Sequence, residues 1–410
     1  MKRIACIALT ICGLGSTAFP QVGPAARGSS VASAARQLQY AFRYAQNAQL
    51  SNHYSNQQTS VVSGSLSYEN GSQTKPFSMN YAGGYTWTLS GPDYQTGQFH
   101  RLYLSQGANT RRWNFNLADN VGYLPQAPTT GFSGIPGIGE PIGSGNPLTS
   151  TNQSILTLNT HVVSNSAIAS VGRTLDYATS LVVGGNSDYM YFPDANGIDT
   201  RTTSGNVGID RRISARTSLL SRYQYSLYQY PSTTVSMRTQ TALGGFRRRV
   251  SRNLDLDVSG GPQWIDSSVQ SVVPAMTNFE LNAFMRYLLR SSSFGAIYFH
   301  GTNGGGGYLI GGTLDSAQGN YLHHFGPNFV LGITGGYQRT AAFNNKGVTN
   351  GVYGGTQATW WLGSRMIVFA NYTGTSQSSS SQLPGNVLND MYNTISFGFG
   401  LSSREPRIRP

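Results

Sequence analysis

Apolar residues alternate with small or polar residues along much of the chain, in runs of about 10 to 13 residues that end at turns or loops. The clearest runs cover Phe77–Leu89, Val235–Leu243, Phe279–Leu289 and Ile395–Leu401. Because the side chains of a strand alternate between its two faces, each run predicts a strand with one apolar face. Strands of soluble sheets have about five or six residues, and these runs are roughly twice that long. Their length favours tilted strands that cross a bilayer over a soluble sandwich or propeller.

The connections between these runs alternate between short and long, as they do at the two ends of a membrane barrel. Counting strands between them predicts one all-β domain over residues 36–402, a single antiparallel transmembrane β-barrel of about 18 strands (range roughly 16–20). Residues 154–174 are interpreted as one strand, with two strands as the alternative. Short connections are expected near 70–75, 107–111, 174–177, 211–215, 247–252, 290–292, 320–327 and 362–364, and long ones near 48–58, 90–96, 122–153, 193–201, 230–233, 265–276, 301–308, 340–350 and 375–391.

Composition supports this interpretation. Only 11% of the residues are charged, 39% are hydrophobic and 50 are glycine, while the mean hydropathy is −0.27. Soluble domains carry about 25% charged residues. A chain that has few charged residues but a low mean hydropathy must intersperse its apolar residues among polar ones. Strands with one face in lipid and the other in water have this pattern. No apolar stretch of about 20 residues follows residue 18, so any membrane crossing must be made by a closed barrel.

The first residues predict a targeting signal. Lys2 and Arg3 precede a short apolar stretch at 4–14, and small residues at 16–18 offer a cleavage site. We therefore expect a signal peptide at 1–18, a short periplasmic segment at 19–35 and a basic periplasmic tail at 403–410. Cys6 and Cys12 both lie in the signal, so the mature chain is expected to lack disulfides. Ile11 stands where a lipoprotein signal would have a small residue, which disfavours lipidation at Cys12.

Charge is distributed unevenly along the predicted barrel, within a net charge of +12. The basic turns can meet anionic phospholipid headgroups, or arginine can simply end strands at a water interface, and both interpretations stay open. Arginines gather at the short-turn end, at Arg111, Arg112, Arg173, Arg211, Arg212, Arg248, Arg249, Arg252, Arg290, Arg365, Arg404, Arg407 and Arg409. Carboxylates gather in long connections, at Asp93, Glu140, Asp188, Asp194, Asp199, Asp266 and Asp390.

Charged and amide side chains fall on the parity opposite the apolar runs over four consecutive predicted strands. An arginine or lysine on a lipid face costs about 2–4 kcal/mol at the bilayer midplane, so this parity predicts a polar lumen. A mixed wall of arginine and aspartate resembles the transverse field of a diffusion pore, although these residues could instead only pair with one another. The predicted pore-lining residues are Arg222, Gln224, Arg238, Gln240, Asp255, Asp257, Glu280, Asn282 and Arg286.

The longest connection is the candidate for a constriction. It is rich in glycine and proline, and the apolar residues along it prefer to pack against something. We expect it either to bend into the mouth of the barrel and narrow the pore, or to pack on the outer rim. The candidate constriction residues are Phe132, Ile135, Ile138 and Ile142.

Catalytic, metal and nucleic-acid chemistry find little support. The six histidines are scattered, and His323-His324 has no cysteine or carboxylate nearby in sequence to complete a metal site. The glycine run at 301–307 lacks the Lys-Ser/Thr ending of a phosphate-binding loop. Basic residues are dispersed over turns rather than interleaved with aromatics on one face. We therefore expect no enzyme activity, no cofactor, no metal and no nucleic-acid partner.

The signal peptide, the strand repeats and segments such as Thr129–Gly137 and Asn350–Gly363 resemble large, mostly uncharacterised porin-like outer-membrane β-barrel proteins of Gram-negative bacteria. The resemblance covers nearly the whole mature chain and concerns architecture more than activity. It implies a last strand that ends in an aromatic residue. Phe397 and Phe399 meet this pattern in part, because residues 402–410 extend beyond them.

We therefore expect an outer-membrane pore for passive or weakly selective diffusion of small hydrophilic solutes. Its expected partners are outer-membrane lipids, the barrel-assembly machinery and the solutes themselves, and the oligomeric state is left open. Two alternatives stay open: an export channel or scaffold for a secreted polymer such as a polysaccharide, and a surface-binding barrel without conductance. The segment 19–35 is too short for a plug domain that would couple to an energy source.

Overall fold

The computed structural model describes residues 37–51, 56–91, 96–124, 161–193, 198–305, 309–343, 347–380 and 390–403. These residues form eighteen strands, the longest of 15 residues and the shortest of 12. The strands are β1 (Gln37–Ser51), β2 (Gln57–Glu69), β3 (Phe77–Ser90), β4 (Gly97–Asn109), β5 (Trp113–Leu124), β6 (Val162–Thr174), β7 (Thr179–Tyr191), β8 (Thr200–Arg212), β9 (Thr217–Gln229), β10 (Ser236–Arg249), β11 (Leu254–Ser267), β12 (Met276–Leu288), β13 (Ser292–Asn303), β14 (Gly312–Phe325), β15 (Phe329–Ala342), β16 (Val348–Leu362), β17 (Met366–Ser379) and β18 (Asp390–Ser402).

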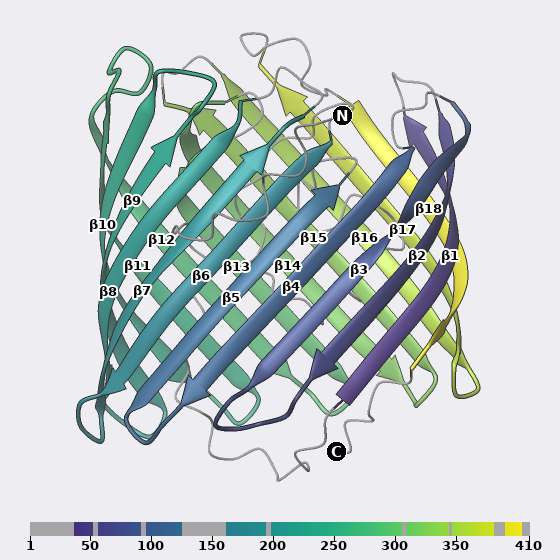
Figure 1. Ribbon diagram of the computed structural model, residues 1–410, viewed down its shortest axis with the longest axis horizontal. Coiled ribbons are helices and arrows are strands. Elements are labelled where there is room, and N and C mark those ends of the chain that lie inside the picture. Colours follow the sequence, from purple (N-terminus) through teal and green to yellow (C-terminus); the bar gives the residue numbers. More distant parts are fainter. Residues whose placement is uncertain are drawn as a thin grey trace, which may run out of the picture.

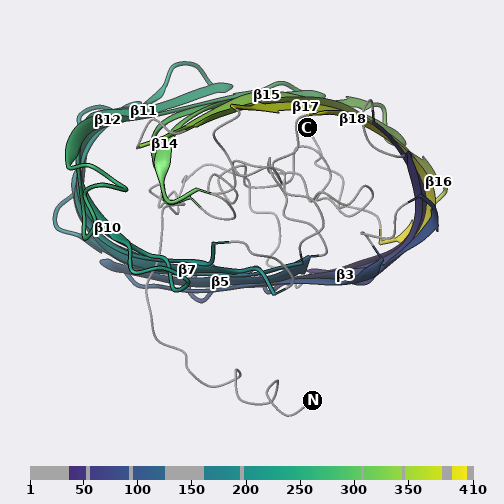
Figure 2. The same ribbon diagram turned by 90° about the horizontal axis from the view of Figure 1, so that it is seen from above.

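Each strand pairs antiparallel with its neighbours in sequence, and β1 also pairs with β18. This last pairing joins Ala41 to Ser402 and continues to Ser51 opposite Tyr392, so the sheet has no free edge. Figure 1 shows the strands inclined in one wall, and Figure 2 shows that this wall closes into a flattened ring. The predicted all-β antiparallel barrel and its count of 18 strands are confirmed.

Short turns lie at one end of the barrel and longer connections at the other (Figure 1). The turns at 175–178, 213–216 and 250–253 coincide with predicted short connections. β1 begins and β18 ends at this short-turn end, where the Ser403 amide donates a hydrogen bond to the Tyr40 carbonyl over 2.8 Å. Within 154–174 the described part contains one strand, β6, while residues 125–160 lie outside the described residues, as do 1–36 and 404–410.

The outer face of the wall carries the large exposed apolar side chains. On β3 these include Tyr81, Tyr85 and Leu89, and β18 contributes Phe397 and Phe399. The apolar runs Phe77–Leu89, Phe279–Leu289 and Ile395–Leu401 therefore face outward, as predicted. No helix in the described part of the chain is long and apolar enough to cross a membrane.

The run Val235–Leu243 faces inward, so the predicted orientation of this strand is wrong. Met237, Thr239 and Thr241 of β10 are buried, whereas the residues between them are exposed. Directly opposed residues of an antiparallel pair project from the same face. Met237 opposes Tyr228 and Thr241 opposes Gln224, both of which are buried on the inner side of β9.

Candidate functional site: a charged sector of the inner wall

Five consecutive strands, β8 to β12, project charged side chains into the barrel. On β11 the inner face includes Asp255 and Asp257, and on β12 it includes Arg286. The register fixes this arrangement, because Asp255 directly opposes Arg249 on one side and Arg286 on the other. We call the inner faces of β8–β12 the charged sector.

Ion pairs run across the charged sector in its half near the short turns. Arg247 contacts Asp257 over 2.8 Å, while Arg222 on β9 reaches Asp210 on β8 only at 3.7 Å. These pairs are made between adjacent strands, so they tie the wall together as well as holding charge in place. Asp210, Arg247 and Arg249 were absent from the predicted pore-lining set. The parity of Asp257, which opposes Arg247, could have identified that arginine once the strand register was known.

One carboxylate near the short-turn mouth serves two arginines. The Arg249 Nε atom lies 3.2 Å from Asp255, and an Arg286 terminal nitrogen lies 2.9 Å from the other oxygen of the same carboxylate. Both arginine side chains are about half exposed, at 56% and 50%, whereas the side chain of Asp255 is 28% exposed. Each guanidinium has five N–H donors, so one carboxylate leaves both with donors that can bind a further anion. This cluster is therefore positively charged and accessible from inside the barrel.

A buried polar network occupies the other half of the charged sector. Glu280 accepts hydrogen bonds from Gln263 and Asn282, each over 3.0 Å. Gln263 also donates to Thr241 and accepts a hydrogen bond from Thr302. Buried charges are costly unless they are hydrogen-bonded, and the two amide donors meet this requirement for the carboxylate. Glu280 is thus part of the packed wall rather than of an open surface.

Of the predicted pore-lining residues, seven lie on the inner face. They are Arg222, Gln224, Asp255, Asp257, Glu280, Asn282 and Arg286. Of these, Gln224 and Glu280 are buried. That these residues line a conducting pore is still a prediction.

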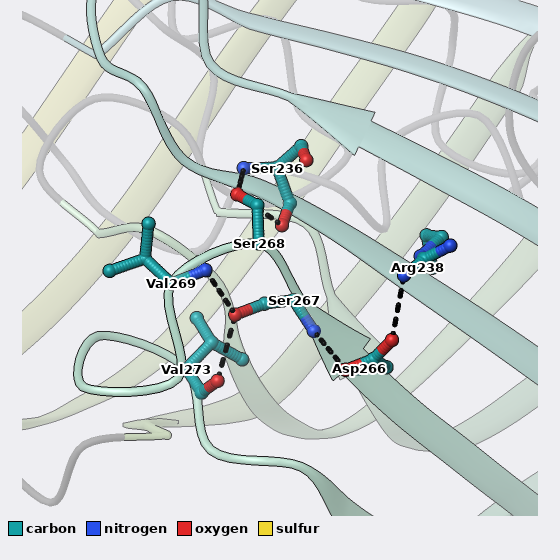
Figure 3. A network of polar contacts seen from close by, with 7 residues as sticks. All are labelled: Ser236, Arg238, Asp266, Ser267, Ser268, Val269 and Val273. Atoms are coloured by element: carbon teal, nitrogen blue, oxygen red, sulfur yellow. Dashed lines mark hydrogen bonds and ion pairs between the residues drawn. The ribbon is translucent and has the colours of Figure 1, made fainter.

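Arg238 and Gln240 lie on the outer face instead, and their predicted inward orientation is wrong. Arg238 opposes Leu227 and Gln240 opposes Tyr225, and both partners belong to the outer face of β9. Figure 3 shows Arg238 reaching Asp266, with a hydrogen bond of 2.8 Å. The error has a physical reason. The apolar residues of β10 pack against an apolar cluster inside the barrel, and a strand whose inner face is apolar cannot be oriented by alternation alone.

This inner cluster lies at the long-connection end of the barrel, and we call it the lid. It combines Tyr228, Tyr230, Val235, Met237, Ile265, Val273 and Phe343. The hydroxyl of Tyr230, after β9, donates to the carbonyl of Gly304, after β13, over 2.6 Å. Three strands separate β9 from β13 in the wall, so this bond joins connections that the sheet itself does not bring together. Burial raises the pKa of the Tyr230 hydroxyl, which keeps it protonated as the donor.

The connection between β11 and β12 anchors the lid to the wall. Ser267 donates to the Val273 carbonyl over 2.9 Å and accepts a hydrogen bond from the Val269 amide (Figure 3). Val273 is fully buried in the lid. The sequence had suggested a constriction from Phe132, Ile135, Ile138 and Ile142, and these four residues lie outside the described residues. The lid arises from several shorter connections, none of which carries a distinctive sequence signal.

The neighbouring stretch of the wall, beyond β13, is polar without charge. The inner faces of β14–β17, which we call the amide sector, have no Asp, Glu, Lys or Arg among their described residues. Their polar side chains include Gln318, Asn320, Thr334, Gln338, Thr340, Thr349, Gln357, Asn371, Thr373 and Gln377. Hydroxyls and amides can donate and accept hydrogen bonds but carry no net charge. The two sectors therefore present different chemistry to the same lumen.

Across the described part of the chain, no group of three or more His, Cys, Asp or Glu side chains could hold a metal ion. His323 contacts Ser292 over 2.6 Å and Tyr321 over 3.2 Å, all on the outer face near the short turns. His300 pairs with Asp315 over 2.5 Å, also on the outer face. These pairs lie on the wall, away from the charged sector.

No known protein family and no curated protein matches the sequence. Among solved structures, the chain is similar to the outer membrane protein OpdK of Pseudomonas aeruginosa, with 10% identity and a TM-score of 0.44 over 89% of this chain and 99% of that chain. It is similar to OccK2 (OpdF) of Pseudomonas aeruginosa, with 10% identity and a TM-score of 0.46 over 90% and 98%. It is also similar to OccAB2 of Acinetobacter baumannii, with 8% identity and a TM-score of 0.45 over 90% and 98%.

Proposed function

We propose that the chain is an outer-membrane pore through which small hydrophilic solutes diffuse passively, with a weak preference for anions. The observation that carries the proposal is the charged sector, which lies on the inner face of a closed barrel whose outer face is apolar. Charged side chains on an inner wall are expected where that wall meets water. A closed barrel is also one of the two structures whose backbone groups are all satisfied within a lipid bilayer.

Barrels of about 16 to 18 strands are wide enough to leave an aqueous channel unless something fills them. Here the lid places packed apolar side chains inside the barrel at the end of the long connections. The open cross-section is therefore smaller than that of a bare ring, which favours small solutes over polymers. This argues against export of a polysaccharide, the main alternative for a barrel of this size.

The preference for anions follows from the composition of the charged sector near the short-turn mouth. Guanidinium groups outnumber carboxylates there, and Asp255 is shared between Arg249 and Arg286. A ring or patch of one sign of charge attracts ions of the opposite sign and raises their local concentration. Because both arginines are half exposed, they can act on a passing solute rather than only on the wall.

Conductance in a planar bilayer tests this function. The wild-type protein should open stable channels, and the reversal potential in a salt gradient should indicate a preference for anions. Changing Arg249→Gln and Arg286→Gln together should reduce that preference, because both accessible positive charges are removed. Arg238→Gln is the matched control: it also removes one arginine next to an aspartate, but on the outer face.

Two outcomes would overturn the proposal. The first is a folded barrel, verified by heat-modifiable migration on a denaturing gel, that opens no channels, which would favour a surface-binding barrel. The second is an equal shift of the reversal potential in Arg238→Gln and in the double variant, because the charged sector would then have no special role.

A further inference from the structure

Three strands that run toward the short turns present an arginine at the same position on the outer face. Arg173 on β6, Arg211 on β8 and Arg248 on β10 each precede the first residue of the next turn by two positions. Their register neighbours are outer-face residues: Arg173 opposes Trp113, Arg211 opposes Leu219, and Arg248 opposes Leu256. The three arginines therefore form a row along the border of the apolar outer face at the short-turn end.

These arginines extend across apolar side chains. The guanidinium of Arg173 lies 5.1 Å from the ring centroid of Trp113, in a cation–π contact. Trp113 and Leu219 are both exposed on the outer face. Long basic side chains place their apolar stems on hydrocarbon and their charged heads in the polar layer above it. Tryptophan prefers the same boundary between hydrocarbon and water.

The turns that follow continue the pattern with exposed apolar residues. Leu175, Ile213 and Val250 open the three turns and are 50%, 62% and 45% exposed. Each lies two residues beyond its arginine and so shares the outward parity. In two of these turns a further arginine follows, Arg216 and Arg252. The surface thus alternates apolar and cationic groups instead of presenting charge alone.

Carboxylates offer these arginines limited compensation, since only Arg211 interacts electrostatically with a carboxylate of the turns, Asp176. In the three turns the only carboxylate is Asp176, and it accepts hydrogen bonds from the amides of Ala178 and Thr179 over 2.7 and 2.8 Å. Ser214 and Ser251 occupy the equivalent turn positions and accept the amides of Arg216 and Asn253 in the same manner. The turn fold therefore requires an acceptor at this position but not a negative charge.

The short turns between β14 and β17 and between β2 and β3 are different. The turns at 70–76, 326–328 and 363–365 contain two basic residues between them, Lys75 and Arg365. The positive charge is therefore concentrated on the side of the barrel from β4 to β13, where the turns at 110–112 and 289–291 add Arg111, Arg112 and Arg290. We call the outer-face arginines Arg173, Arg211 and Arg248, together with turns 175–178, 213–216 and 250–253, the basic rim.

We propose that the basic rim binds the phosphate headgroups of anionic phospholipids in the membrane leaflet at the short-turn end. The inference rests on insertion of the barrel in a membrane, as the proposed function requires, but not on conductance. Arginine matches phosphate oxygens with paired N–H donors, and each basic residue near an anionic surface strengthens the attraction. Lipid fits this surface better than an acidic protein does. The arginines lie at the edge of an apolar face that continues along the strands, and lipid offers both hydrocarbon for that face and phosphate for the arginines.

Spin-labelled lipids test the proposal directly. The full chain is reconstituted in phosphatidylcholine vesicles that contain either spin-labelled phosphatidylglycerol or spin-labelled phosphatidylcholine, and the motionally restricted fraction is measured by electron paramagnetic resonance. The wild type should associate with the phosphatidylglycerol probe more strongly than with the phosphatidylcholine probe, by about fivefold at the sites concerned. The triple variant Arg173→Gln, Arg211→Gln and Arg248→Gln should lose this preference, and Arg→Lys at the same positions should keep most of it.

The matched control changes Arg201→Gln and Arg339→Gln, two exposed outer-face arginines near the end of the long connections. It should reduce the phosphatidylglycerol preference much less than the triple variant does, because Arg339 lies directly opposite Asp315, which offsets its charge. Equal association of both probes with the wild type would overturn the proposal, as would an undiminished preference in the triple variant. Channel recordings on the same variants separate the two hypotheses, since loss of the lipid preference with normal conductance leaves the pore function standing.

Discussion

The charged sector and the amide sector line the same lumen on either side of β13, yet they satisfy the need for a polar wall in different ways. On β8–β12, arginines and aspartates of adjacent strands are held in pairs such as Arg247 with Asp257. On β14–β17, glutamine, asparagine and threonine occupy the equivalent inner positions. Both solutions are compatible with the same backbone, so the sheet itself does not dictate them. Of the two sectors, only the charged sector carries the charges that can distinguish an anion from a cation.

The ion pairs of the charged sector are expected to contribute little to the free energy of unfolding. Exposed pairs are worth about 0 to 1 kcal/mol, and Arg249 and Arg286 are half exposed. The presence of these ion pairs is therefore better explained by their effect on solutes than by their contribution to folding. The amide sector lacks that effect, and substitutions there should be felt through hydrogen bonding alone. Three experiments address this contrast.

The largest effect is expected when the sign of the short-turn mouth is reversed. Changing Arg249→Glu and Arg286→Glu places three carboxylates, with Asp255, where two guanidiniums and one carboxylate now lie. The ion preference should invert from anions to cations, and the reversal potential in a salt gradient should change sign. A reversal potential of unchanged sign would mean that the charged sector does not govern ion passage. The difference between the two sectors would then have no effect on ion selectivity.

An intermediate effect is expected from the lid that overlies the charged sector. Tyr230→Ala removes a fully buried ring, a change that costs about 3 to 5 kcal/mol for large aromatic side chains in packed interiors. The lid should loosen, so single-channel conductance should rise and its fluctuations should increase. Tyr230→Phe keeps the ring and removes only the hydrogen bond to Gly304, so its effect should be smaller. Identical traces from the wild type and Tyr230→Ala would show that the lid does not narrow the path.

The smallest effect is expected in the amide sector. Changing Thr373→Val and Thr375→Val replaces two partly exposed inner hydroxyls by methyl groups of similar volume. Ion preference should be unchanged, because no charge is altered. Passage of an uncharged sugar, measured by swelling of protein-containing liposomes, should slow modestly because two hydrogen-bonding partners are lost. A marked shift in reversal potential would contradict the division into two sectors.

The architecture was predictable because the physical constraints on it repeat along the whole chain. The alternation at Phe77–Leu89 and Phe279–Leu289 indicates strands with one apolar face. Short turns indicate where strands end, so the number of strands follows by counting. The same reasoning placed Arg222 and Arg286 correctly, because their strands have a clear apolar face opposite to them.

The site was less predictable where the interior itself is apolar. Met237 lies in the lid and resembles an outward residue in sequence, so Arg238 and Gln240 were assigned to the wrong face. The lid depends on contacts such as Tyr230 with Gly304, which are 74 residues apart and follow no local pattern. Asp210 and Arg247 become identifiable only through the register of three adjacent strands. Local alternation carries no information on either kind of contact.

The pairing of β1 with β18 has a consequence for how the protein forms. These strands lie at opposite ends of the described chain, and the contact of Tyr40 with Ser403 joins residues 363 positions apart. Contacts of such separation are slow to form, because a long loop must close before they contribute. Until the final strand arrives, the first one presents a row of unpaired amide and carbonyl groups that can template aggregation. Biogenesis must therefore shelter an open edge for as long as the intervening sixteen strands take to assemble.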